Sequence, residues 1–355
     1  MLDWSKQGAE AGPGGSVGPG GPGVLAPAAT GAARLIERYG GDVDRVFGRV
    51  GIPPEIIDNP IQSLSLGAFC GLFEEAARVT RHDNFGLWFG HQFKPRDLGM
   101  WGYMAVCSPT VGSALENLIG NFEYHQQGST MRLTEADSLL RLEYQITDGR
   151  ILERRQDAEL SLGMFFNVFR ECYGTAWAPE EVHFEHPKPL DWQEHERAFD
   201  APVYFNQPTN ALLFRREALD GRMPNCDLKL MNLVQTCLTA LGLSGEASES
   251  LVDRLRNQVR IRLPEGYPAL DSIAAELGQS ASAIQRSLAF EGLTYKDLVE
   301  STRQDLAQVY LKQAHMALSE IAFLLGYSEL SAFSRAFRRW HGVSPREYRE
   351  RMARR

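Results

Sequence analysis

The sequence predicts an α+β domain with a mixed sheet and helices, followed by an all-α domain with two helix-turn-helix motifs joined by a linker helix. Three observations support this prediction. The chain has 355 residues, more than the roughly 100–200 that one domain uses. Strand-like and helical patterns alternate up to residue 243, whereas only helical patterns follow. An internal repeat also occurs within the helical part.

Residues 1–28 are rich in Gly and Pro and show no hydrophobic periodicity. Such a segment buries too little apolar surface to offset its ordering entropy, so we expect a disordered tail there. It also lacks the basic flank and apolar stretch of a secretory signal. No run of about 20 apolar residues predicts a membrane span. We therefore expect a cytoplasmic protein.

The five cysteines are scattered along the chain, and no pair has the Cys-x-x-Cys spacing. An odd number without that spacing argues against a disulfide framework and against a cysteine-based zinc site. We expect reduced and mostly buried thiols.

Residues 29–243 are expected to form the α+β domain. Alternating apolar and polar side chains on both sides of a turn at 135–137 predict a β-hairpin over 129–146, with one buried face. Apolar residues at helical spacing predict a helix over that sheet, which Gly174 ends. A short polar linker is predicted at 244–250, before the second domain at 251–355.

The net charge differs between the two predicted domains. The whole chain carries a formal charge of −8, but residues 251–355 contain 16 basic and 12 acidic side chains. The excess of acidic over basic side chains therefore lies entirely in residues 1–250. DNA phosphates would repel this negatively charged part of the chain. We expect any DNA contact to be C-terminal.

The internal repeat lies in the second domain, where residues 270–280 match residues 318–328 at six of eleven positions. Each copy has a short apolar helix, a Gly that tolerates positive φ, and a Ser able to cap the next helix. These features predict helix-turn-helix motifs at 270–290 and 318–340. Two copies are too few for the alternative, a stacked helical solenoid. The amphipathic helix expected between them is long enough to set two recognition helices about one DNA turn apart.

The second helix of each motif combines a buried apolar face with an exposed face of small and polar residues. Arg pairs bidentately with guanine, Gln reads adenine, and small residues allow close approach to the bases. We expect base contacts from Ser282, Ala283, Gln285 and Arg286 in the first motif, and from Ser331, Ala332, Ser334 and Arg335 in the second. Arg338 and Arg339 are expected to contact phosphates or acidic neighbours, or to be solvated.

Residues 321–349 closely resemble the signature of AraC/XylS-type transcription regulators, and the first motif is similar to the other helix-turn-helix of that family. The resemblance implies a regulator of double-stranded promoter DNA, usually an activator, with RNA polymerase as a partner. It also implies that the first recognition helix dominates base contacts, through Ser282, Gln285 and Arg286. Many relatives have a larger residue where this chain has Ser282 and Ala283, so fewer direct base contacts are expected here.

Residues 91–128 resemble the arabinose-binding-type sensor domain found in one branch of that family. This resemblance implies an effector-binding domain of mixed α/β type, distinct from the cupin barrel of other branches, which could also form a homodimer. Residues 153–187 are similar to activators of amine and amino-acid catabolism, which implies an amine or amino-acid effector and a catabolic operon as the target.

A small-molecule pocket needs an apolar lining with a few convergent polar groups. The side chains of that character in the first domain are Trp101, Tyr103, Phe122, Tyr124, His125, Glu159, Phe166 and Arg170. For the aromatic residues the alternative is an ordinary core position, and for Glu159 and Arg170 it is an exposed one. A cationic amine would be recognised by a carboxylate and aromatic faces, which Glu159 and its neighbours could supply.

Two other classes of protein are possible. His183, Glu185, His186, His195 and Glu196 are metal-ligand residue types, but continued strand alternation would place His183 and Glu185 opposite His186. We therefore expect no convergence of these side chains, no metal site and no cofactor. No nucleotide-binding or nucleophile motif occurs, so we expect no enzyme. The other alternative is a DNA-binding regulator whose first domain only dimerises or binds a protein partner.

Overall fold

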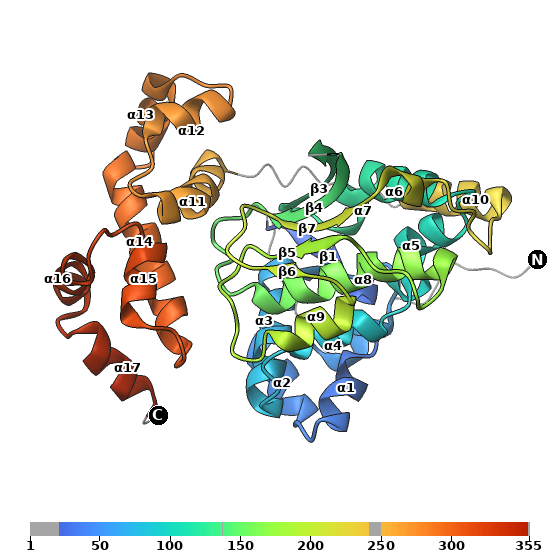
Figure 1. The fold of residues 1–355 in the computed structure, drawn as a ribbon, viewed down its shortest axis with the longest axis horizontal. Coiled ribbons are helices and arrows are strands. Elements are labelled where there is room, and N and C mark those ends of the chain that lie inside the picture. The colour runs from blue at the N-terminus through green and yellow to red at the C-terminus, as the bar shows by residue number, and fades with distance from the viewer. Residues whose placement is uncertain (1–20, 137, 241–249, 354–355) are drawn as a thin grey trace, which may run out of the picture.

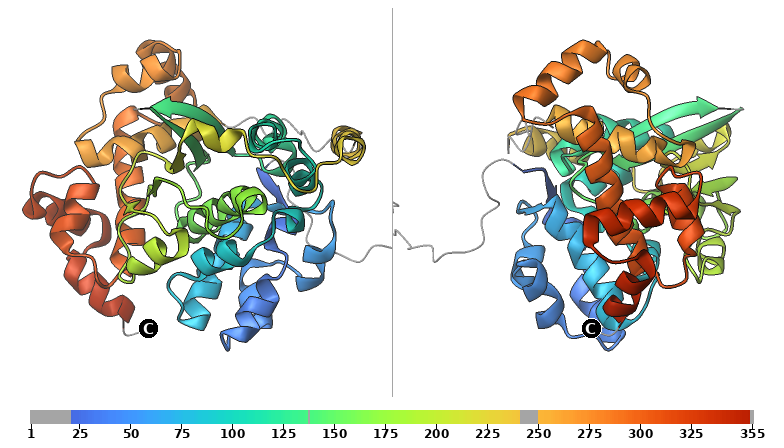
Figure 2. Two further views of the ribbon diagram at one scale, coloured as in Figure 1. Left: turned by 45° about the vertical axis from the view of Figure 1, so that its right-hand side comes forward. Right: turned by 90° about the vertical axis from the view of Figure 1, so that its left-hand side faces the viewer.

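The computed structural model describes residues 21–136, 138–240 and 250–353, and it shows an α+β domain beside an all-helical domain (Figure 1). This arrangement confirms the predicted fold class. Two further views show the helical domain standing against one side of the α+β domain (Figure 2). None of the helices in the described ranges is long and apolar enough to cross a lipid bilayer.

The α+β domain begins inside the predicted tail. Strand β1 (Gly23–Leu25) pairs antiparallel with β2 (Ser63–Ser65), and the 3-10 helix η1 (Ala26–Ala29) follows it. Val24 has no exposed surface. The prediction of a tail up to residue 28 is therefore wrong for this segment, because the short apolar run after the Gly/Pro stretch packs into the core. The rest of that tail, residues 1–20, lies outside the described residues.

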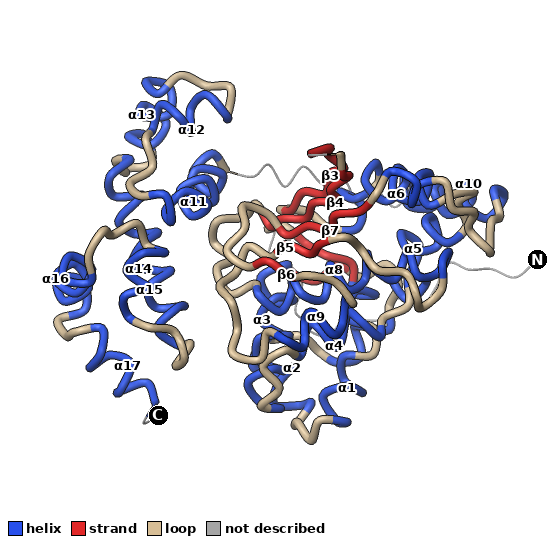
Figure 3. The backbone as a smooth tube through the Cα atoms, in the orientation of Figure 1, coloured by secondary structure: helices blue, strands red, loops and turns tan. Residues whose placement is uncertain are grey.

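The main sheet has five strands in the order β3-β4-β7-β5-β6 (Figure 3). All pairings are antiparallel except β5 with β6. The strands are β3 (Ser129–Ala136), β4 (Leu139–Ile146), β5 (Glu181–His183), β6 (Val203–Tyr204) and β7 (Asn210–Phe214).

The predicted hairpin over 129–146 is confirmed as β3 and β4, but its turn is tighter than expected. Glu135 and Ala136 belong to β3, and Ala136 pairs with Leu139. Ser138 takes a positive φ of 70°. The predicted turn residue at position 137 lies outside the described residues.

The long helix α8 (Arg155–Tyr173) is confirmed and ends at Gly174, whose φ is 78°. Most of its first twelve residues are buried. Helix α4 (Phe85–Gln92) crosses α8 so closely that a Cβ atom at Gly86 or Gly90 would overlap the α8 backbone. This close packing fixes the position of the charged side chains on the first two turns of α8.

The other helices of this domain surround α8 and the sheet. They are α1 (Ala32–Arg38), α2 (Val43–Val50), η2 (Pro54–Asp58), α3 (Leu66–Thr80), η3 (Pro95–Leu98), α5 (Gly99–Val106), α6 (Val111–Gly120), α7 (Phe122–His125), α9 (Gln193–Phe199), η4 (Arg216–Leu219) and α10 (Leu228–Ala240). The predicted linker at 244–250 lies, apart from its last residue, outside the described part of the chain.

The second domain has its own hydrophobic core and contains only helices among its described residues. In Figure 1, α12 and α13 lie at one end of α14, and α15 to α17 lie at the other. The elements are α11 (Leu251–Arg262), η5 (Leu263–Glu265), α12 (Leu270–Glu276), α13 (Ala281–Phe290), α14 (Tyr295–Lys312), α15 (Leu318–Leu324), α16 (Leu330–His341) and α17 (Pro345–Ala353). The tandem motifs and the linker helix between them are thus confirmed.

A buried polar cluster connects the two domains. Arg154, at the start of α8, donates to the Oδ1 atom of Asn257 in α11 at 3.1 Å. Its Nε atom lies 2.8 Å from Glu185 Oε1, and Glu185 Oε2 accepts a hydrogen bond from Arg260 of α11 at 2.8 Å. Burial would raise the pKa of Glu185, but the two guanidinium groups outweigh this effect and lower that pKa to about 2.

Candidate DNA-binding interface and effector site

The first helix-turn-helix motif consists of α12, a turn at Gly278 and α13. Gly278 has a φ of 63°, which lets the chain reverse after α12. The hydroxyl of Ser280 accepts a hydrogen bond from the amide of Ala283 at 3.2 Å and so caps α13. Ile284 and Leu288 are fully buried, which orients the helix on the core.

The opposite face of α13 is open to solvent. Ser282, Gln285 and Arg286 are exposed, and Ala283 is half-buried. The side chains of Gln285 and Arg286 have no hydrogen bond or ion pair with a described residue, so both are available to an outside partner. This face holds the four residues that the sequence predicts as base readers of the first motif.

The second motif, α15 and α16, has a different turn. Glu329 is the N-cap residue of α16 and makes no capping bond with its side chain. The prediction that Ser328 caps this helix is therefore wrong, because α16 begins four residues after Gly326 whereas α13 begins three after Gly278. The extra residue moves the serine out of the capping position.

The exposed face of α16 carries the predicted residues of the second motif. Ser331 and Arg335 are exposed, while Ala332 and Ser334 are half-buried. Ser331 donates to Glu329 Oε2 at 2.9 Å, so an exposed carboxylate lies at the start of this helix. A carboxylate there would repel DNA phosphates.

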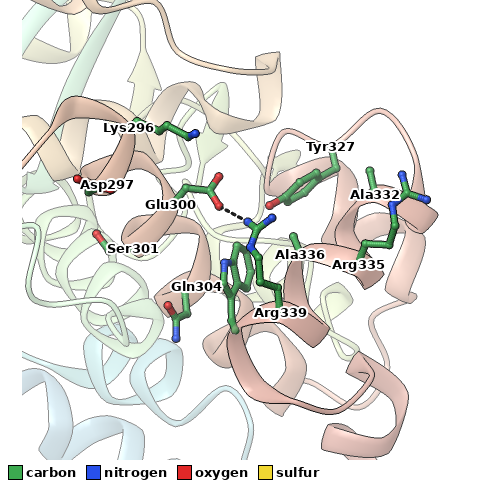
Figure 4. Close-up of a pocket in the computed structure, with 11 residues that line it drawn as sticks. Lys296, Asp297, Glu300, Ser301, Gln304, Tyr327, Ala332, Arg335, Ala336 and Arg339 are labelled. Atoms are coloured by element: carbon green, nitrogen blue, oxygen red, sulfur yellow. Dashed lines mark hydrogen bonds and ion pairs between the residues drawn. The ribbon is translucent and has the colours of Figure 1, made fainter.

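Arg338 and Arg339 differ in their surroundings. Arg339 donates to Glu300 Oε2 at 2.9 Å, across a cavity of about 740 Å³ between α14 and α16 (Figure 4). Figure 4 shows Arg335 pointing away from this pair. The side chain of Arg338 is exposed and has no hydrogen bond or ion pair within the described ranges. The expectation of an acidic neighbour thus holds for Arg339.

Three of the predicted effector residues come together in the core. The rings of Trp101 and His125 stack at 4.3 Å, and Phe122 lies 5.7 Å from Trp101. They line a cavity of only about 10 Å³, which is room for about one water molecule. Burial lowers the pKa of His125 to about 3, so its ring is neutral. This arrangement is that of core packing, the alternative considered for these residues.

The other predicted effector residues lie elsewhere. Tyr103 is 40% exposed, and Tyr124 packs against a separate small cluster around Leu238. Phe166 is buried, with the guanidinium of Arg170 4.0 Å above its ring. The eight residues thus do not line one common cavity.

Glu159 is fully buried, so the exposed position considered for it is wrong. Its Oε1 atom lies 2.9 Å from His195 Nε2 and 3.6 Å from His186 Nε2. The prediction that the histidines do not converge is therefore wrong for His186 and His195. Strand β5 ends at His183, so alternation no longer sets the direction of His186. His183 instead hydrogen-bonds to Glu181 at 2.9 Å.

A cleft of about 940 Å³ lies between the two domains. Sequence reasoning missed it because its lining comes from segments far apart in the chain. These are α2, α3, α8, α11, α14, α17, the loops around residues 81 and 190, and the segments 152–154 and 313–315. Glu74 lies in this lining, accepts a backbone hydrogen bond from Gln156 at 3.0 Å, and has no ion pair with a described residue. Burial raises its pKa to about 7.

Comparison with known proteins identifies the family. Residues 40–223, more than half of the chain, match the family described as the arabinose-binding domain of AraC transcription regulators, N-terminal. The chain belongs to the AraC family. Residues 273–351 of this AraC-family protein also match a helix-turn-helix domain family. It is thus a DNA-binding transcription regulator with an arabinose-binding-type N-terminal domain, as the resemblance in the sequence implies.

Known proteins match this AraC-family regulator over most of its length. The transcriptional regulator VirS of Mycobacterium tuberculosis is 30% identical over 324 residues, which cover 89% of this chain and 93% of VirS. The ornithine utilization regulator of Pseudomonas aeruginosa is 27% identical over 318 residues, with the same coverage. The crystal structure of CdpR from Pseudomonas aeruginosa matches with a TM-score of 0.43 and 21% identity, over 89% of this chain and 97% of CdpR.

Proposed function

We propose that α13 is the main base-reading element of this AraC-family regulator, and that an amine or amino-acid effector controls its binding to DNA. The assignment of base reading to α13 rests on its exposed face. There the side chains of Gln285 and Arg286 have no hydrogen-bond or ion-pair partner among the described residues. Arg and Gln are the residue types that pair with guanine and adenine in the major groove. On α16, by contrast, Glu329 lies at the helix start and Arg339 pairs with Glu300.

Footprinting on the DNA that flanks the regulator's own gene tests this assignment. We expect Arg286→Ala to weaken specific binding by about 5- to 150-fold, since a bidentate base contact contributes about 1–3 kcal/mol. Arg335→Ala, the matched change on α16, is expected to weaken it less. Circular dichroism would verify that both variants fold. An equal or larger effect of Arg335→Ala would contradict the proposal.

The cleft between the domains is the cavity we propose for the effector. Its volume of about 940 Å³ falls within the range of about 300–1,000 Å³ typical of ligand pockets. Glu74 offers a carboxyl group whose pKa is raised to about 7 by burial, and an effector ammonium would favour its charged form. Arg81 also lines the cleft, is exposed, and would suit the carboxylate of an amino acid. The name of the ornithine utilization regulator agrees with this class of ligand.

An effector in this cleft would contact both domains and could therefore favour one arrangement of them over another. Activation of a catabolic operon, RNA polymerase as a partner and a homodimer are further parts of this proposal. They follow from the resemblance to activators of the same family.

Calorimetric titration of the full chain with amino acids, diamines, sugars and simple carboxylates tests the effector. We expect binding of an amino acid or amine, and at least a 10-fold weaker affinity in Glu74→Gln. Glu37→Gln on the exposed side of α1 is the matched control. If no compound of the panel binds, a first domain that only dimerises or binds a protein partner becomes the better explanation.

A further inference from the structure

We propose that Glu159, His186 and His195 form a binding site for a divalent cation of the zinc class inside the α+β domain. The three side chains come from α8, from the loop after β5 and from α9, and all three are buried. Their potential ligand atoms lie within 4.8 Å of one another. Two imidazoles and one carboxylate are a donor set that zinc commonly accepts.

The two distances from the carboxylate oxygen of Glu159 are close to those around such an ion. In a tetrahedral zinc site with bonds of about 2.0–2.1 Å, ligand atoms lie about 3.3 Å apart. Here Glu159 Oε1 is 2.9 Å from His195 Nε2 and 3.6 Å from His186 Nε2. The potential ligand atoms of the two histidines lie within 4.8 Å of each other, so rotation of their rings about the side-chain bonds would complete the geometry.

The hydrogen bonding of His186 indicates which of its nitrogens is available. Its Nδ1 atom lies 2.9 Å from the carbonyl oxygen of Pro187, and because a carbonyl only accepts, Nδ1 carries the hydrogen. In the neutral ring Nε2 then presents a lone pair, and this atom faces the carboxylate of Glu159. Two acceptors facing each other call for a cation between them. A backbone carbonyl that fixes the tautomer of a ligand histidine is a common feature of metal sites.

Three buried side-chain atoms of the cluster lack a hydrogen-bond partner among the described residues. They are Glu159 Oε2, His186 Nε2 and His195 Nδ1. Leaving a buried polar atom unsatisfied costs about 1–3 kcal/mol. A bound cation would remove this cost for Glu159 and His186, but not for Nδ1 of His195.

The surroundings favour a bound ion and give it a route of entry. Phe184 and Phe205 lie against the ring of His195, with centroid distances of 5.6 and 5.3 Å, and form an apolar shell. His186 also lines the cleft between the domains, so an ion can enter from there and keep an open coordination position on that side.

Arg155 is the group that competes with a cation for Glu159. Its Nη1 atom lies 3.4 Å from Glu159 Oε1, whereas its Nη2 atom lies 2.8 Å from Asp83 Oδ1. The closer partner would hold Arg155 in place when a metal takes the carboxylate of Glu159. The second oxygen of Glu159, which has no partner now, gives the metal a further contact point.

The test uses the full chain, stripped with a chelator and then titrated with Zn²⁺ in competition with a coloured chelator. We expect one equivalent of Zn²⁺ per chain, and an affinity at least 10-fold weaker in His186→Gln and His195→Gln. His183→Gln, on the neighbouring strand and outside the cluster, is the matched control and should bind like the unmodified chain. Absence of stoichiometric binding, or equal affinities of His186→Gln and His183→Gln, would overturn the proposal.

X-ray absorption of the zinc-loaded, unmodified chain gives a readout that does not depend on how the variants fold. We expect two imidazole nitrogens, oxygen ligands and no sulfur around the metal. Sulfur ligands would place the metal at exposed thiols such as Cys226 and Cys237, and fewer than two imidazoles would place it at another surface site. Either result would overturn the proposal.

Discussion

Arg260 of the helical domain donates a hydrogen bond to Glu185 of the α+β domain at 2.8 Å, and the two side chains are only 13% and 5% exposed. Charge-assisted hydrogen bonds in such surroundings contribute about 1.5–3 kcal/mol. We expect Arg260→Ala to weaken the contact between the domains, and small-angle X-ray scattering to show a larger radius of gyration. Arg254→Ala, on the same helix and without an ion pair to a described residue, is the control. An unchanged scattering curve would show that this pair does not hold the domains together.

Gly278 and Gly326, the turn glycines of the two helix-turn-helix motifs, allow a matched comparison of how much stability a substitution removes. A Cβ atom at Gly326 would lie 2.5 Å from the carbonyl oxygen of Leu263 and 2.8 Å from that of Gly266, whereas nothing lies within 4 Å of one at Gly278. Both residues have positive φ, so Ala costs about 1–2 kcal/mol at either position, and Gly326→Ala adds a backbone clash. We predict that urea unfolding shows a larger loss of stability for Gly326→Ala than for Gly278→Ala. Equal losses would mean that the turn relaxes away from η5.

The N-caps of the two recognition helices, α13 and α16, differ, which allows a second comparison of stability. Ser280 caps α13 with its hydroxyl, whereas the side chain of Glu329 makes no capping bond to α16. Loss of a serine N-cap costs about 1 kcal/mol. Thermal unfolding should therefore show a lower melting temperature for Ser280→Ala and little change for Ser328→Ala. The reverse order would contradict the positions of the helix starts described above.

The salt dependence of DNA binding should separate Arg338 from Arg339. An exposed arginine that contacts a phosphate releases a counterion, so its removal lowers the slope of log K against log salt by about 1. We expect this change for Arg338→Ala. Arg339→Ala should change the slope less, since Arg339 already pairs with Glu300 at 2.9 Å. Fluorescence anisotropy over a range of salt concentrations measures both slopes, and identical slopes would show that the Glu300 pair opens on DNA.

Features set by neighbouring residues could be predicted from the sequence. The hairpin over 129–146 follows from period-two alternation, and α8 follows from helical periodicity that ends at Gly174. The tandem motifs follow from apolar spacing and from the glycines at 278 and 326. The exposed face of α13 was found for the same reason, because burying Ile284 and Leu288 places Gln285 and Arg286 outside.

Features that depend on long-range packing could not be predicted. The Glu159–His195 contact joins residues 36 positions apart, and the Glu185–Arg260 contact joins residues 75 positions apart. No local sequence pattern indicates which residues so far apart in the sequence will be in contact. Aromatic content also cannot distinguish a pocket from a core, and Trp101 and Phe122 have the composition of a ligand site although they surround almost no empty space.

The two helix-turn-helix motifs differ in turn length, in the cap of the recognition helix and in the charge at its start. A protein whose two DNA-binding motifs differ is asymmetric along the double helix. The two motifs would fit an operator in one orientation only. Inverting the operator sequence would therefore invert the orientation of the bound protein. The N-terminal domain would then face a fixed end of the site, either toward or away from the start of transcription.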